Sequence, residues 1–185
     1  ILTSLVIIVL SWALGNICDL LGTGPEVVNA TKSWMSGAFI PAVIFILSAM
    51  ISFATGTSWG TMAIVTPVGL TLAYQLGGIE LLTITSGAIF SGSIFGDHCS
   101  PISDSTIMSC IFSGANLMAH TLSQVPIALT SAAIAITVYL LSTFLKSGVI
   151  LLIAAIIIQY FVYNYLGERY QQKFSVEDRQ ILNQP

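Results

Sequence analysis

The chain has 185 residues, of which 55% are hydrophobic and only 7% are charged, and its formal net charge is −3. A soluble domain carries about 25% charged residues, so this composition excludes an ordinary soluble fold. The small negative charge comes without a basic patch, which argues against nucleic acid as a partner. The mean hydropathy of +0.92 agrees with a protein whose outer solvent is a lipid bilayer.

Seven apolar segments follow one another along the chain, separated by short polar or Gly/Pro-rich breaks: residues 2–21, 39–54, 62–74, 79–95, 106–118, 122–145 and 149–166. A spanning helix needs about 20 apolar residues, a length that the first, sixth and seventh segments reach. The sequence therefore predicts an all-α, polytopic helical membrane protein, with a membrane domain over residues 1–166 and a polar tail over residues 167–185. The chain begins inside an apolar run without an initiator Met or a basic n-region, so we expect a fragment and not a signal peptide.

The four middle segments are shorter than a span and form two pairs. Residues 55–61 interrupt the first pair, residues 96–105 interrupt the second, and Gly77-Gly78 makes the turn between the pairs. Short segments interrupted by Gly or Pro in paired positions are typical of broken or re-entrant helices around the binding site of a transporter. Ordinary short spans joined by interfacial loops are the alternative.

The second break carries the strongest chemical signal. Its sequence, Gly-Asp-His-Cys-Ser-Pro-Ile-Ser-Asp-Ser-Thr over residues 96–106, holds two carboxylates, one imidazole and four hydroxyls between apolar flanks. A charge at the bilayer centre costs at least about 2.5–3.5 kcal/mol, and Pro101 disfavours an unbroken helix. Carboxylates, hydroxyls and the carbonyls freed by such a break suit a hard cation. The predicted cation and proton site therefore comprises Asp97, Asp104, Ser100, Ser103, Thr106 and His98, with sodium held at Asp97 and Asp104.

Other chemistry fits the same string poorly. Asp97, His98 and Cys99 are zinc-type ligands, but adjacent positions lack the spacing of a zinc site. The sequence has no G-x-S-x-G elbow or other nucleophile signature, so we predict neither an enzyme nor a cofactor. His98 either takes part in proton transfer or makes a structural hydrogen bond, and the sequence leaves both readings open.

Three strings resemble the NhaC-type sodium/proton antiporters, over nearly everything from Trp12 to about Leu145. The first is the string over residues 96–107, G-D-H-C-S-P-I-S-D-S-T-I. The second is A-T-G-T-S-W-G-T over residues 54–61, and the third is W-A-L-G followed by L-G-T-G over residues 12–24. The resemblance implies a multi-pass antiporter of the cell membrane that is built from inverted repeats, of which this chain supplies the second, C-terminal half.

The resemblance also implies roles for particular residues. Asp97 and Asp104 would lie near the ion path, with Thr57, Ser58 and Thr61 of the first break facing them. Some members of the family exchange organic anions such as malate and lactate, which leaves the substrate open.

Two features outside the breaks complete the sequence predictions. Asp19, near the end of the first segment, either lines the path or is solvated at the interface. Lys146 precedes the last segment whereas Arg169, Lys173 and Arg179 follow it, and this excess of positive charge predicts a cytoplasmic tail.

The mechanism that the sequence favours is competition, in which one buried carboxylate holds either a proton or a sodium ion and is exposed to the two sides in turn. The implied partners are sodium ions, protons, the lipid bilayer and the missing N-terminal half of the same transporter, and a homo-oligomer is left open. Two rivals remain. An organic-anion exchanger should need a cationic anchor, and a membrane scaffold without transport activity would not need two acids in a Pro-broken helix.

Overall fold

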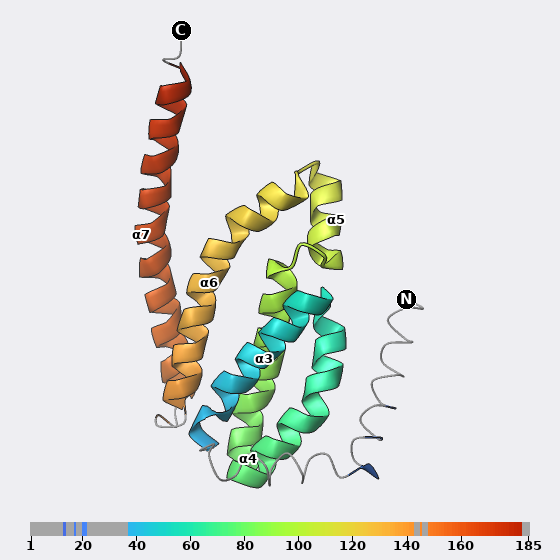
Figure 1. The fold of residues 1–185 in the computed structure, drawn as a ribbon. Coiled ribbons are helices and arrows are strands. Elements are labelled where there is room, and N and C mark those ends of the chain that lie inside the picture. Colours follow the sequence, from blue (N-terminus) through green and yellow to red (C-terminus); the bar gives the residue numbers. More distant parts are fainter. Residues whose placement is uncertain are drawn as a thin grey trace.

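The structure of the chain is a computed structural model. It describes residues 37–142, residue 145 and residues 148–182, with side chains as far as residue 167, together with the single positions Ala13, Ile17, Leu20 and Leu21. Within these residues the regular elements are helices and no strand occurs: η1 (Gly37–Phe39), α3 (Ile40–Thr55), α4 (Ser58–Cys99), α5 (Asp104–Ser113), α6 (Leu117–Ser142) and α7 (Gly148–Leu182) (Figure 1). The predicted fold class is confirmed.

Four stretches of the described residues are helical, long enough and apolar enough to cross a membrane: Gly37–Thr55, Ser58–Cys99, Leu117–Ser142 and Gly148–Gly167. Backbone groups within a bilayer must be satisfied inside the protein, and helices do this. The chain is therefore a polytopic helical membrane protein. The first predicted segment, residues 2–21, falls almost wholly outside the described residues.

Helix α4 is a hairpin of two arms. Gly78 has φ 65° and ψ −155°, which is not helical. In Figure 1 the ribbon of α4 descends to the lower end of the bundle and then ascends again. We call residues 58–77 the descending arm and residues 79–99 the ascending arm. The Gly77-Gly78 turn is thus confirmed, but the prediction of segments shorter than a span is wrong for both arms. At about 20 residues and 1.5 Å per residue, each arm is about 30 Å long, because polar residues of the flanking motifs join the helix.

The turn at Gly78 gives a test of the hairpin. Gly78→Ala is expected to lower the stability of the folded protein by about 1–3 kcal/mol, because a side chain strains a backbone with this φ and ψ. A methyl group there would meet no atom within 4 Å, so crowding contributes nothing. Thermal unfolding in detergent measures the effect, with Gly148→Ala as control, since Gly148 also has open space around it but lies at the start of a helix. Equal melting temperatures for the two variants would contradict the assigned turn.

Helix α3 packs in parallel against the ascending arm. A methyl group built on Gly92 would overlap the carbonyl oxygen of Phe45, and one built on Gly96 would overlap the carbonyl oxygen of Ala49. Both residue pairs advance by one helical turn, so the two helices run in the same direction. Glycine lets the backbones approach this closely, as is common between membrane helices. The apolar core lies on the Gly78 side of this contact and joins α3 to both arms of α4. It consists of Ile40, Ile44, Val65, Leu72, Ala73, Leu81 and Ile89.

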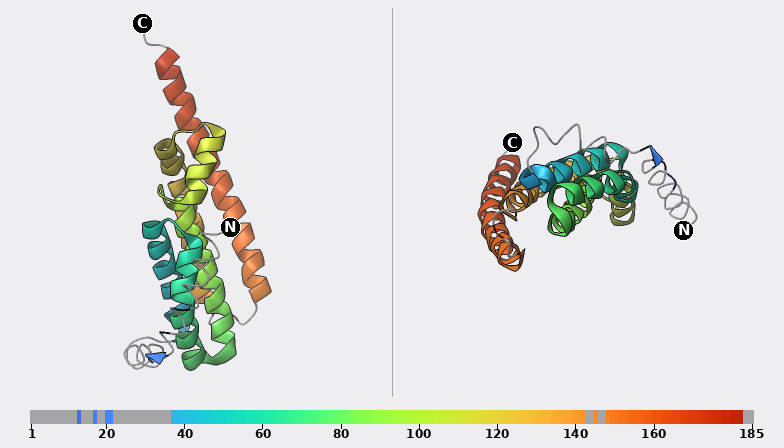
Figure 2. Two further views of the ribbon diagram at one scale, coloured as in Figure 1. Left: turned by 90° about the vertical axis from the view of Figure 1, so that its right-hand side faces the viewer. Right: turned by 90° about the horizontal axis from the view of Figure 1, so that it is seen from below.

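Helices α6 and α7 lie to one side of α3 and α4 (Figure 2). Tyr139 of α6 hydrogen-bonds to Ser91 of the ascending arm at 2.8 Å, and its ring packs against Phe45 of α3. Helix α7 continues as one helix to Leu182, beyond the predicted start of the tail at residue 167. The cytoplasmic location of the tail stays a prediction, because Lys146 and the side chains of the tail lie outside what the structure describes.

Candidate functional site

The two breaks predicted from the sequence touch each other. Gly56, with φ 67°, caps the C-terminal end of α3, and a methyl group there would lie 2.7 Å from the carbonyl oxygen of Ile102 in the second break. The hydroxyl of Ser100 donates to the carbonyl oxygen of Phe53 at 2.8 Å. Ser100 thus satisfies a carbonyl in the last turn of α3, where helical partners run out. The C-terminal ends of α3 and α4 therefore converge on one place.

This junction lies at the level of a candidate membrane span. In Figure 1 the link between α4 and α5 lies at a level between the two ends of α6, and α6 is itself a candidate span. Non-helical backbone at such depth is tolerated where it is buried in protein or lines a watery cavity. Residues 100–103 meet this condition in part, since Ser100 and Ser103 are fully buried.

Asp97 is the buried acid of the junction. It lies in the last turn of α4 and is 9% exposed. The hydroxyl of Ser103 donates to Oδ1 at 2.8 Å, and the hydroxyl of Ser105 donates to Oδ2 at 3.1 Å. The two serine hydroxyls are themselves 2.8 Å apart. Three side chains from the end of α4, the link and the start of α5 thus form one polar cluster, which we call the Asp97 cluster.

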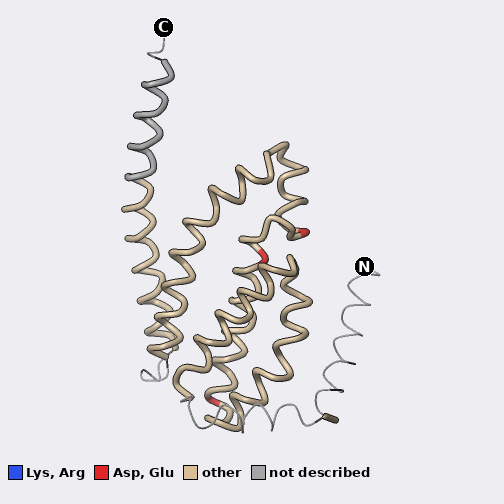
Figure 3. Tube along the Cα trace, viewed as in Figure 1, with Lys and Arg blue, Asp and Glu red and all other residues tan. Residues whose placement is uncertain are grey.

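No lysine or arginine occurs between residues 33 and 145. Figure 3 shows acidic positions at the α4–α5 link and at the hairpin turn of α4, and no basic position in the tan part of the tube. Asp97 lies in the last turn of α4, where the helix dipole favours a cation, and its carboxylate accepts from the cap and the first turn of α5. Among residues 33–145 the carboxylate of Asp97 therefore has no lysine or arginine with which to pair.

Asp104 occupies a different environment. It is the first residue of α5, where the helix dipole favours an acid, and its side chain is exposed in this chain. No hydrogen bond among the described residues joins it to the Asp97 cluster. Within the described residues no three Asp, Glu, His or Cys side chains gather to hold a metal ion. Among the described residues, the oxygens around Asp97 are those of one carboxylate, of serine hydroxyls and of backbone carbonyls.

The remaining predicted residues of the second break have local roles. His98 is exposed, and its Nδ1 lies 2.9 Å from the carbonyl oxygen of Ile94 one turn earlier, which favours the structural reading of this residue. Ser103 caps α5 by accepting from the backbone N–H of Ser105 at 3.2 Å. Thr106 is 4% exposed, on the inner face of α5.

The first break contributes backbone to the junction more than side chains. Thr57 caps α4 by accepting from the N–H of Gly60 at 3.3 Å, and Thr61 donates to the carbonyl oxygen of Thr57 at 2.8 Å. Ser58, the first residue of α4, is half-buried. No hydrogen bond of the described residues links these three side chains to Asp97. Asp19 lies outside the described residues.

Ser105 is the residue of the cluster that the sequence analysis left out of its candidate site. The string contained its hydroxyl, but the direction in which Pro101 turns the chain decides which hydroxyls reach Asp97, and spacing alone does not give that direction. Cys99 and Cys110 are free thiols, and both are buried. Cys18 lies outside the described part of the chain.

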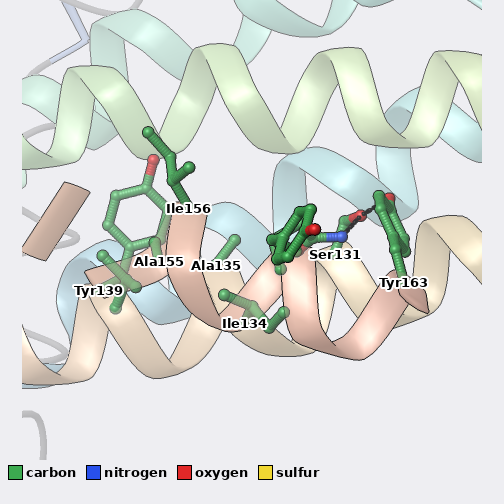
Figure 4. Close-up of a pocket in the computed structure, with 10 residues that line it drawn as sticks. Ser131, Ile134, Ala135, Tyr139, Ala155, Ile156 and Tyr163 are labelled. Carbon is green, nitrogen blue, oxygen red and sulfur yellow. Dashed lines mark hydrogen bonds between the residues drawn. The ribbon is translucent and has the colours of Figure 1, made fainter. Parts of the chain in front are cut away.

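A hollow between α6 and α7 offers a second place for a ligand (Figure 4). It has a volume of about 520 Å³ and is lined mainly by apolar and aromatic side chains. Three of its polar groups bond to one another, since the Ser131 hydroxyl is 2.7 Å from the Tyr163 hydroxyl and accepts from Gln159 at 3.0 Å. These bonds fasten α7 to α6 and already occupy the groups that a polar ligand would need, which makes the Asp97 cluster the stronger candidate.

Comparison with known proteins gives a family match. A model described as the Na+/H+ antiporter family matches residues 1–144. An uncharacterized protein of Haemophilus influenzae is 33% identical over 145 residues, which are 78% of this chain and 28% of that protein. No solved structure matches the chain.

Two further relatives carry functional names. The malate-2H(+)/Na(+)-lactate antiporter of Bacillus subtilis is 30% identical over 133 residues, covering 63% of this chain and 28% of the relative. An uncharacterized Na(+)/H(+) antiporter of Haemophilus influenzae is 32% identical over 124 residues, covering 58% and 26%. The chain thus spans about a quarter of the length of the curated relatives that it matches.

Proposed function

Because the chain belongs to the Na+/H+ antiporter family, we propose that it is part of a secondary transporter that exchanges sodium ions for protons across the cell membrane, with Asp97 as the exchanging acid. The observation that carries this proposal is a buried carboxylate at a helix break, in a stretch of more than a hundred residues without lysine or arginine. Transport proteins of this kind are antiporters and not enzymes in the catalytic sense. The NhaC subtype and the assignment to a C-terminal half rest on the quoted strings.

The exchange follows from competition for one carboxylate. In the proton-bound form Asp97 is neutral and its hydroxyl finds an acceptor among the serine oxygens. In the sodium-bound form the carboxylate and nearby hydroxyl and carbonyl oxygens replace part of the hydration shell of the ion. Because both ligands use the same oxygens, only one binds at a time, and exposure of the site to each side in turn exchanges them. We propose that the approach to this site is lined by Thr57, Ser58, Thr61, Asp104 and Asp19.

A second candidate is exchange of an organic anion, as the name of the Bacillus subtilis relative describes for that protein. A carboxylate substrate needs a cationic anchor or free helix N-termini. This chain has no lysine or arginine between residues 33 and 145, and the N-terminus of α5 already carries Asp104. The residues of this chain therefore favour sodium as the substrate, and an organic anion would have to bind to other parts of the transporter.

Proton flux driven by a sodium gradient, measured in proteoliposomes with the full-length transporter, tests the proposal. Sodium alone should also stabilise the purified protein against heat, by about 2.7 kcal/mol at 100 times its dissociation constant. Malate or lactate should add nothing in the absence of sodium. Stabilisation by these anions, without sodium-driven proton flux, would replace sodium/proton exchange by the second candidate.

The serine hydroxyls give a graded test of the site. Ser105→Ala removes one of the two hydroxyls that bond to Asp97 and is expected to weaken sodium binding about tenfold, or about 1.4 kcal/mol. Ser113→Ala is the matched control on the same helix, because its hydroxyl only donates to the backbone carbonyl oxygens of Ser109 and Cys110. The sodium concentration for half-maximal proton flux measures the effect. An unchanged value in Ser105→Ala would remove this hydroxyl from the site.

A further inference from the structure

Buried hydroxyls without a partner lie on the inner faces of α3 and α4. The side chains of Ser48, Ser93 and Thr85 are fully buried, and their oxygens make no hydrogen bond. Buried polar groups in native proteins nearly always have a partner, either from the protein or from ordered water. Such a group in a membrane protein therefore points to a small ligand beside it.

Two of these hydroxyls belong to one place. Ser48 packs against Gly92, where a methyl group would lie 3.0 Å from the Ser48 Cβ. Ser93 is the next residue, and its carbonyl oxygen accepts from Ser52 of α3 at 2.6 Å. Both residues thus lie in the contact between α3 and the ascending arm. Thr85 lies two turns further from Asp97, beyond the core residue Ile89, and does not join them.

Ser93 precedes Asp97 by four residues on the ascending arm, which places the two side chains on the same face, about 5–6 Å apart between Cβ atoms. Ser48 and Ser93 are therefore about one helical turn from the exchanging acid. They lie on the side of Asp97 that faces the ends of the arms at Gly78. Ser103 and Ser105 approach Asp97 from the opposite side, since both follow it beyond the end of α4.

The chemistry of the hydroxyls decides between a cation and water as the ligand. Ser48, Ser52 and Ser93 are uncharged, and the nearest acid already accepts two hydrogen bonds from Ser103 and Ser105. A sodium ion among them would lose its hydration without an opposite charge in contact. A water molecule carries no such cost and typically makes about three hydrogen bonds to buried groups that lack partners.

We propose that Ser48 and Ser93 line a buried water site at the level of Gly92, and that this water delivers protons to Asp97 by a route separate from that of the cation. This inference rests on the proposed exchange at Asp97. In the step, the water gives one proton to the carboxylate oxygen and takes another from a second water or from a serine hydroxyl beside it. Only O–H bonds break and form, and the proton is the one that the exchange reaction consumes.

The test separates proton delivery from cation binding in the full-length transporter. Ser48→Ala, Ser93→Ala and the double variant are compared for sodium/proton exchange and for sodium/sodium counterflow with labelled sodium, which needs no proton. We expect the double variant to lose exchange about tenfold or more while counterflow stays at the wild-type rate. Ser86→Ala is the matched control on the same arm, because its hydroxyl is satisfied by the carbonyl oxygen of Thr83 at 2.8 Å.

Each other result overturns the inference. If exchange and counterflow are both unchanged, the hydroxyls of Ser48 and Ser93 have only a packing role. If both activities fall together, the two serines take part in cation binding. Thermal unfolding checks that each variant is folded. If the double variant fails to fold, the single variants must show the same selective loss in smaller measure. If the proposed function itself is wrong, Asp97→Asn will leave both sodium/proton exchange and sodium/sodium counterflow intact, and this result distinguishes the two kinds of failure.

Discussion

Asp97→Asn is expected to lower sodium-driven proton flux at least about a hundredfold, equivalent to about 2.7 kcal/mol, while the protein still inserts and folds. Asparagine keeps the size of the side chain and one oxygen, but it removes the negative charge and the titratable proton. Both are required if proton and sodium compete for this carboxylate. Flux in proteoliposomes across a range of pH measures the loss.

The local geometry explains why the fold should survive this change. The amide oxygen of the introduced asparagine still accepts from Ser103, and its amide group donates to the hydroxyl of Ser105, which can turn to accept. A charge at membrane depth is also removed, and that charge is costly. A merely structural Asp97 would accordingly tolerate the substitution with near-normal flux, and this outcome would sink the assignment.

Two other acids serve as comparisons. Glu80→Gln changes an acid on the same arm of α4 but at its opposite end, and is expected to leave flux near the wild-type value. Asp104→Asn is expected to impair exchange, as the sequence string predicts, but less than Asp97→Asn, because Asp104 is exposed in this chain and lies outside the Asp97 cluster. A larger loss in Asp104→Asn than in Asp97→Asn would move the exchanging acid to the start of α5.

Local backbone chemistry made much of the fold predictable. Pro101 removes a backbone donor and cannot continue a helix, and the link between α4 and α5 occurs there. The Gly77-Gly78 pair predicted the turn of the hairpin, and the Gly-Thr-Ser string predicted the end of α3, because positive φ is available to glycine at little cost. The lengths of the arms were mispredicted because hydropathy counts apolar residues only, whereas α4 includes polar residues at both ends, from Ser58 to Thr61 and from Gly96 to Cys99.

The site was predictable as a string and not as an arrangement. The sequence marks out Asp97, Ser100 and Ser103, because polar residues between apolar segments are costly in a membrane and usually have a function there. Which of them is buried depends on tertiary packing, and so the sequence could not separate Asp97 from Asp104 or include Ser105. The serines of α3 gave no signal at all, because single hydroxyls are common in membrane helices, and only the contact with Gly92 and Gly96 gives Ser48 and Ser52 their position.

That contact leads to the largest expected effect on stability. Gly96→Ala would place a methyl group into the carbonyl oxygen of Ala49, and within 2.8 Å of both the Phe53 nitrogen and the Ser52 Cβ. Overpacking of a tight interior costs about 1–3 kcal/mol, and here the obstacle is mostly backbone, which cannot rotate away as a side chain does. We expect the upper end of this range or beyond, measured as a fall in melting temperature.

The same substitution nine residues earlier is the control. A methyl group on Gly87 would meet only the Tyr139 hydroxyl, at 3.6 Å, and alanine favours a helix over glycine by about 1 kcal/mol. Gly87→Ala should therefore leave the melting temperature unchanged or raise it. Gly96→Ala should also reduce exchange, because any shift of α3 away from the ascending arm pulls the Phe53 carbonyl from the Ser100 hydroxyl and so loosens the junction that holds Asp97. Equal stability and equal flux in the two variants would mean that α3 and the ascending arm do not meet at these glycines, and the junction of the two breaks would then lose its structural basis.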